Sequence, residues 1–168
     1  MDLDELLDLL QSNSLVVIIS SLLVYLIVIT RRDSFVVVIA ASCVVAVAHQ
    51  FYDAALVEMS KDESNRALVR DLWYLGFAAS DFLLVLACYK LLEKLSLRPN
   101  KVTTFYLNCY LFLGFIQLVR YADRILIKTD FLGPAYQLAI PAINSSMVII
   151  TVAYVGYSIS YKIKKEIF

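Results

Sequence analysis

The chain has 168 residues, of which 61% are hydrophobic and 18% are charged, whereas soluble domains contain about 45–50% and about 25% of these classes. Too few polar residues remain to cover a water-soluble domain of this size, so the composition indicates an integral membrane protein. The 15 basic and 15 acidic residues cancel, which excludes the net positive charge that is typical of nucleic-acid-binding domains.

The first residues predict a short amphipathic helix over residues 1–12. Leu3, Leu6, Leu7 and Leu10 recur at helical spacing, and acidic residues fill the other face. A secretory signal peptide needs basic residues at its start, and none is present here. We therefore expect the next apolar run to be retained as a spanning helix, while the amphipathic helix lies flat at the membrane interface or docks to a partner protein.

Five apolar segments can cross about 30 Å of hydrocarbon, which takes about 20 residues at a rise of 1.5 Å each. The predicted spans are residues 14–30, 34–57, 72–92, 102–127 and 136–161, followed by a basic tail over 162–168. The fold class is therefore all-α. We expect residues 1–168 to form a single transmembrane domain, a bundle of five transmembrane helices preceded by a short amphipathic N-terminal helix.

Basic residues are distributed unevenly between the two sides of this bundle. Nine lie on the side of the C-terminal tail, among them Arg31, Arg32 and Lys94, and four lie on the other side, among them Lys61 and Arg66. Lys and Arg accumulate in cytoplasmic loops. The distribution therefore predicts an outside N-terminus and an inside C-terminus in an inner or plasma membrane.

Several polar side chains lie inside the predicted spans, all in the outer half of the bilayer when depth is counted at 1.5 Å per residue. An uncompensated charge near the midplane costs at least about 2.5–3.5 kcal/mol, so such groups are candidates for a functional site and are expected to pair. This intramembrane polar cluster consists of His49, Asp53, Asp81, Gln117, Arg120, Asp123, Arg124 and Asn144.

The direction of the side chains predicts the pairs. In a helix they lean toward the N-terminus, so Asp81 and Arg120, on helices of opposite direction, lean toward each other. We therefore expect Asp81 to face Arg120. A second predicted contact joins His49 or Asp53 to Arg124 or Tyr121.

The sequence gives little support for catalysis or metal binding. Only one His is present, and Cys43, Cys88 and Cys109 lie in apolar runs without ligand spacing, so we expect no metal and no cofactor. Ser42 is two helical turns from His49, too far for a nucleophile and its base, and the common catalytic motifs are missing. We expect that the protein is not an enzyme.

The polar cluster has two interpretations. It is either a buried ion-pair network that fixes helix packing, or the lining of an outward-open cavity for a proton, an ion or a small polar ligand. The second leads to our hypothesis of a channel-like or transport subunit, embedded in the lipid bilayer as a homo-oligomer or with other membrane subunits, and without nucleic acid. The alternative is a non-conducting interaction, sensor or anchoring subunit that works through partner proteins.

Overall fold

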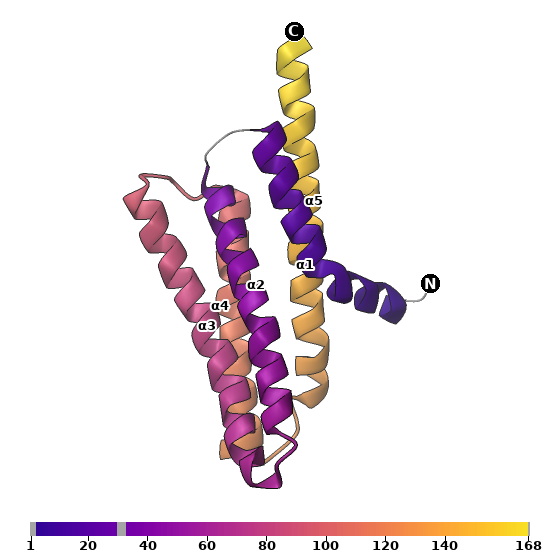
Figure 1. Cartoon of the computed structure of the whole chain (residues 1–168), viewed down its shortest axis with the longest axis vertical. Helices are drawn as coiled ribbons and strands as arrows, with labels where there is room; N and C mark the ends of the chain where they lie inside the picture. Colours follow the sequence, from indigo (N-terminus) through magenta and orange to yellow (C-terminus); the bar gives the residue numbers. More distant parts are fainter. Residues whose placement is uncertain (1–2, 30–32, 168) are drawn as a thin grey trace.

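The computed structural model describes residues 3–29 and 33–167, and within these ranges the chain forms helices and no strands. Four of the helices are long and apolar enough to cross a membrane, and Ser14–Val28 adds a shorter apolar segment. The long helices run side by side (Figure 1). The prediction of an all-α membrane bundle is therefore confirmed. The elements after the first helix are α2 (Ser34–Met59), the 3₁₀ turn η1 (Glu63–Asn65), α3 (Arg66–Lys94), α4 (Lys101–Tyr121), the π-helical turn η2 (Ala122–Leu126) and α5 (Gly133–Ile167).

The first helix, α1 (Leu3–Val28), joins the amphipathic residues and the first apolar segment without a break. Figure 1 shows its first turns pointing away from the bundle, whereas the rest packs along α5. Its apolar part, Ser14–Val28, is about 22 Å long at 1.5 Å per residue and is the shortest of the five segments. The described residues do not include 1–2 and 30–32. Arg31 and Arg32, on which the predicted orientation partly depends, are therefore outside them.

Short polar side chains determine where two of the spans begin. The Asp33 carboxylate accepts hydrogen bonds from the N–H groups of Phe35 and Val36, at 3.1 and 3.2 Å, and the Asn100 side chain accepts one from Thr103 N–H at 2.8 Å. Both satisfy amide groups that the first turn of a helix leaves unpaired.

A related turn joins α2 to α3 outside the spans. There Asp62 accepts hydrogen bonds from the N–H and the hydroxyl of Ser64, at 2.9 and 2.8 Å. These bonds stabilise the ionised carboxylate and lower the pKa of Asp62 below its ordinary value. The same contacts start the turn η1, so the connection between the two helices is built by its own side chains.

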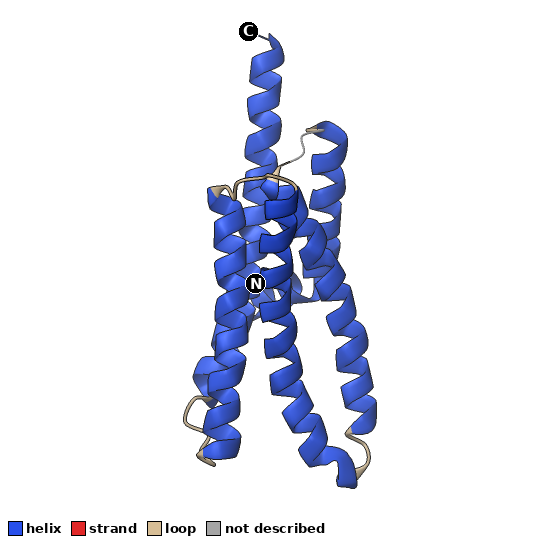
Figure 2. Ribbon diagram, turned by 90° about the vertical axis from the view of Figure 1, so that its left-hand side faces the viewer, coloured by secondary structure: helices blue, strands red, loops and turns tan. Residues whose placement is uncertain are grey.

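The helices form two groups, because α1 packs mainly on α5 while α2, α3 and α4 pack on one another. Figure 2 shows the same arrangement from the side, with the C-terminal end of α5 extending beyond the other helices. Aromatic contacts join the groups near that end: the ring centroid of Phe35 lies 5.2 Å from that of Tyr25 and 4.5 Å from that of Tyr154. Further along, the Tyr106 hydroxyl of α4 donates to the Met147 carbonyl of α5 at 2.7 Å.

Gly76 is required where α2 and α3 approach each other. A Cβ atom at this position would lie 2.7 Å from Cζ of Tyr52 and closer still to its hydroxyl oxygen, which donates to the Leu72 carbonyl at 2.8 Å. Overpacking of this kind costs about 1–3 kcal/mol, whereas the better helix propensity of Ala returns at most about 1 kcal/mol. We expect Gly76→Ala to lower the free energy of unfolding, measured by thermal unfolding in detergent.

Gly156→Ala provides the matched control, because Gly156 is exposed and an added Cβ atom there meets nothing within 4 Å. This variant should be as stable as the wild type or slightly more stable. Equal effects of the two substitutions would contradict the close contact between Tyr52 and Gly76.

Candidate functional site

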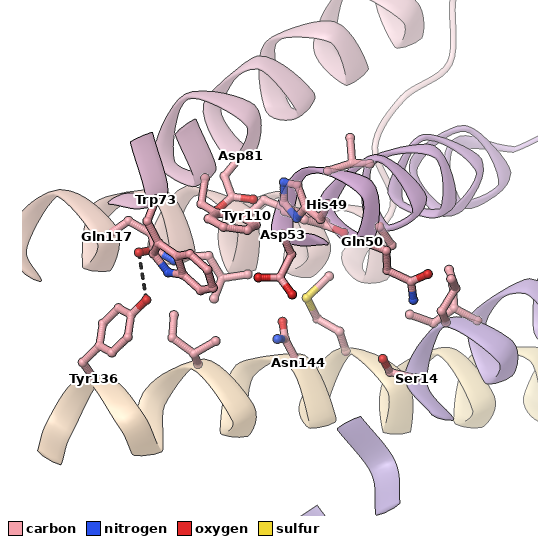
Figure 3. A pocket seen from close by; sticks show the side chains of 18 residues that line it. Ser14, His49, Gln50, Asp53, Trp73, Asp81, Tyr110, Gln117, Tyr136 and Asn144 are labelled. Atoms are coloured by element: carbon pink, nitrogen blue, oxygen red, sulfur yellow. Dashed lines mark hydrogen bonds between the residues drawn. The ribbon is translucent and has the colours of Figure 1, made fainter. Parts of the chain in front are cut away.

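A cavity of about 370 Å³ lies between the α1–α5 pair and the other three helices. All five long helices contribute side chains to its wall, and Figure 3 shows polar groups reaching it from opposite sides. We call this space the interhelical cavity. Its polar and amphipathic lining residues are Ser14, His49, Gln50, Asp53, Trp73, Asp81, Tyr110, Gln117, Tyr136 and Asn144.

Helical periodicity explains why these residues share a cavity. Residues three or four positions apart lie on one face of a helix, and the lining residues of each long helix follow this spacing. On α3 they are Trp73, Phe77 and Asp81. On α2 they include Ala46, His49 and Asp53, on α4 Tyr110, Leu113 and Gln117, and on α5 Tyr136, Ile140 and Asn144.

The cavity extends from near the α2–α3 connection to the middle of the bundle. At 1.5 Å per residue, Asp53 is about 9 Å from the Met59 end of α2, and Asp81 is about 22 Å from the Arg66 end of α3. Both depths lie within the length of a membrane-spanning helix. The polar groups therefore lie between the α2–α3 end of the bundle and the middle of its helices.

Hydrogen bonds fix some of the polar side chains in the wall. Nε2 of His49 lies 2.6 Å from Oγ of Ser80, and that hydroxyl donates to the Phe77 carbonyl at 2.8 Å. Since a serine has one hydroxyl proton, His49 is the donor in its bond to Ser80. On the other side of the cavity, the Tyr136 hydroxyl donates to Oε1 of Gln117 at 2.9 Å (Figure 3).

Asp81 differs from these groups. Only 4% of its surface is exposed, and it makes no hydrogen bond and no ion pair with any residue that the structure describes. Asp53 also lines the cavity, and within the described ranges no Lys or Arg does. The wall therefore carries two carboxyl groups without a Lys or Arg partner, and its one His bonds to Ser80.

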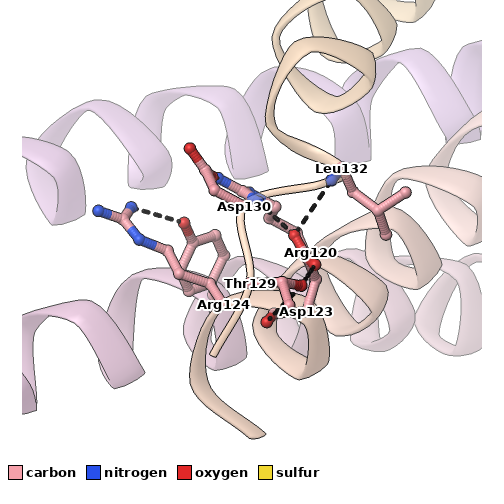
Figure 4. A network of polar contacts seen from close by, with 7 residues as sticks. Arg120, Asp123, Arg124, Thr129, Asp130 and Leu132 are labelled. Atoms are coloured by element: carbon pink, nitrogen blue, oxygen red, sulfur yellow. Dashed lines mark hydrogen bonds and ion pairs between the residues drawn. The ribbon is translucent and has the colours of Figure 1, made fainter. Parts of the chain in front are cut away.

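Arg120 belongs to a second, separate network, which we call the α4–α5 ion-pair network. Its guanidinium donates to Asp123 at 2.5 Å and also to Asp130 of the α4–α5 connection. Asp123 in turn accepts hydrogen bonds from the Thr129 hydroxyl and from the Leu132 N–H, the latter at 3.2 Å (Figure 4). Arg120 and Asp123 are buried, with 7% and 4% of their surface exposed, and the network ties the end of α4 to the start of α5.

The predicted pair of Asp81 and Arg120 is therefore wrong. Residues three apart in a helix are neighbours, so Asp123 meets the guanidinium within one turn, and the loop residue Asp130 supplies a second carboxylate. Asp81 lies about 10 Å further along the bundle than Tyr74, whose ring packs on Tyr121 with centroids 6.3 Å apart. The nearer acids therefore take the position that Asp81 would have filled.

The second predicted contact is also wrong. Arg124 donates to the Tyr74 hydroxyl at 3.2 Å (Figure 4), His49 bonds to Ser80, and no bond joins Asp53 to Arg124 or Tyr121 in the described part of the chain. Arg124 lies in the π-helical turn η2. A π turn has more residues than an α turn, which shifts the face on which Arg124 lies.

The eight residues of the intramembrane polar cluster thus divide into two sets. His49, Asp53, Asp81, Gln117 and Asn144 line the interhelical cavity. The other three, Arg120, Asp123 and Arg124, lie outside its wall, near the α4–α5 connection. Sequence reasoning missed Gln50, Trp73, Tyr110 and Tyr136 as lining residues, although the four-residue spacing from Trp73 to Phe77 and Asp81 contains the signal.

The donor set does not favour a metal. Within the described residues, no group of three or more His, Cys, Asp or Glu side chains is arranged to hold a metal ion. Cys43, Cys88 and Cys109 are free thiols that are buried or half-buried in the bundle. The chain matches no protein-family model, no curated protein and no solved structure. The chemistry of the cavity is therefore argued from its own residues.

Proposed function

We propose that the protein is a channel-like or transport subunit whose interhelical cavity holds a small polar solute or ion within the membrane. The observation that supports this proposal is the contrast between the two polar sets. In the α4–α5 ion-pair network, the charges are paired, and Arg120 and Asp123 are buried, as in a structural network. In the cavity, Asp53, Asp81 and Asn144 surround a hollow of about 370 Å³, which has the size of a small-molecule site.

The same proposal places the cavity toward the outer side of the membrane, with the N-terminus outside and the C-terminus inside. It also includes assembly as a homo-oligomer or with other membrane subunits, because the small residues Ala153 and Gly156 lie exposed on α5 and small residues let helices in lipid approach closely. In bacteria, we expect a cytoplasm-only fluorescent reporter fused after Phe168 to give signal, and a periplasm-active reporter to give none. The opposite pattern would contradict the orientation.

Flux through liposomes tests the function. Vesicles with the purified protein should pass protons, monovalent ions or small organic ions faster than protein-free vesicles, and Asp81→Asn should reduce that flux while thermal stability is kept. Removing the carboxylate takes away the charge that would attract a permeating cation. The matched control is Glu63→Gln, which neutralises an exposed carboxylate in the connection between α2 and α3.

One observation favours the alternative of a non-conducting interaction or anchoring subunit. The first turns of α1 point away from the bundle (Figure 1), where another protein would reach them. This alternative predicts liposomes that stay impermeable to all three solute classes, together with a co-purifying protein that is lost when residues 1–10 are deleted. That combination would overturn the transport proposal.

A further inference from the structure

We propose that the ligand of the interhelical cavity is a small organic cation, an ammonium compound held by the carboxylates of Asp53 and Asp81 and by aromatic rings. This inference rests on the proposed function, because it names the class of solute that the same cavity takes. Three independent features of the wall point to it: its carboxyl groups without a Lys or Arg partner, its aromatic surface and its poor fit to a metal.

The first feature is the pair of carboxyl groups in the cavity wall. Asp81 lines the cavity with 4% of its surface exposed and has no hydrogen-bond or ion-pair partner among the described residues. Asp53 lines the same space, and Arg120, which the sequence suggests as the partner of Asp81, is held by Asp123 and Asp130 instead. Carboxylates are costly at membrane depth unless they are compensated. A bound cation would supply that compensation in a region of low dielectric, where the attraction is strong.

The aromatic surface decides between kinds of cation. Trp73, Phe77, Tyr110 and Tyr136 contribute rings to the wall, which Asp53 and Asp81 also line (Figure 3). Aromatic rings attract weakly hydrated organic ammonium groups through their negative faces and are used in this way in aromatic cages. An inorganic cation would instead require several oxygen ligands in close geometry, and no group of three such acidic, His or Cys side chains is present in the described ranges.

The cavity provides its own reporter, because Trp73 is the sole Trp of the chain and lines the wall. Tetramethylammonium should change the Trp73 fluorescence of the detergent-purified full chain in a saturable manner. Its neutral isostere tert-butanol and sodium at the same ionic strength should not. We expect Asp53→Asn/Asp81→Asn to weaken tetramethylammonium binding at least about tenfold, which corresponds to about 1.4 kcal/mol. Glu63→Gln, the matched neutralisation outside the cavity, should bind as the wild type does.

Binding and flux separate the two proposals. Equal responses to tetramethylammonium and tert-butanol, or tetramethylammonium binding that survives in the double variant, would overturn the organic-cation assignment. Absence of a response to tetramethylammonium in a protein that still conducts protons or sodium would overturn it as well, while the transport function stands. Saturable binding in liposomes that pass no solute would keep the ligand assignment and contradict transport.

A folded double variant, checked by its helical circular dichroism, is required for the comparison. If the double variant fails to fold, Asp53→Asn alone replaces it.

Discussion

Replacing Arg120 with Met should lower the free energy of unfolding by about 3 kcal/mol, near the lower end of the cost of breaking a buried ion pair. The Arg120 side chain is 8% exposed and bonds to two acids, and its loss leaves the buried Asp123 without its cation. The Asp130 side chain is 78% exposed, so water can solvate its carboxylate once Arg120 is gone. We therefore expect a destabilisation at the lower end of the range. Thermal unfolding of the purified protein in detergent measures the effect.

Double-mutant cycles test whether Arg120 interacts with Asp123, as the structure shows, or with Asp81, as the sequence suggests. Arg120→Met and Asp123→Asn should be non-additive, because the two side chains are in contact. Arg120→Met and Asp81→Asn should add, because Asp81 belongs to the cavity. Coupling between Arg120 and Asp81 would show that the sequence-based pair forms after all and would contradict the division of the polar cluster into two sets.

Filling the cavity should abolish transport. Ala46 is a small residue in the wall, one turn from His49 on α2, and a Trp side chain at this position would fill part of the cavity. We expect Ala46→Trp to reduce flux into liposomes to the level of protein-free vesicles. Because the Trp side chain would block the route of the solute, the loss of flux should be larger than the loss from neutralising a single carboxylate.

The control for this substitution lies two residues away. Ala48 is on the same helix but exposed on the outside of the bundle, where a Trp side chain would meet lipid or detergent. Ala48→Trp should therefore transport as the wild type does, with the same thermal stability. Undiminished transport by a folded Ala46→Trp variant would mean that the solute follows a different path.

The membrane spans could be predicted from the sequence because bilayer thickness and helical rise together set the length of an apolar segment. The order of the polar residues along each helix follows from the same rise per residue, and the spacing of Ala46, His49 and Asp53 predicts their common face. Position along a helix and direction around it are both local properties. They need no knowledge of which helices are neighbours.

The pairs could not be predicted, because they depend on irregular segments. Asp130 lies in the α4–α5 connection, where no periodicity places a side chain, and η2 changes the face on which Arg124 lies. The packing of α1 on α5 joins the two ends of the sequence, and both helices line the cavity together with α2, α3 and α4. Whether polar residues pair or enclose a hollow is decided by such tertiary contacts.

Cysteine labelling at position 46 measures most directly whether the interhelical cavity is an aqueous site or a packed network. In a chain with Cys43, Cys88 and Cys109 replaced by Ala, Ala46→Cys should react with a charged, membrane-impermeant thiol reagent added on the side of the α2–α3 connection. Ala48→Cys, which is exposed on the outside of the bundle, should not react, because a thiol in lipid stays protonated and unreactive. A cysteine at position 46 that is as unreactive as one at position 48, from both sides of the membrane, would contradict a water-filled cavity and with it the transport function.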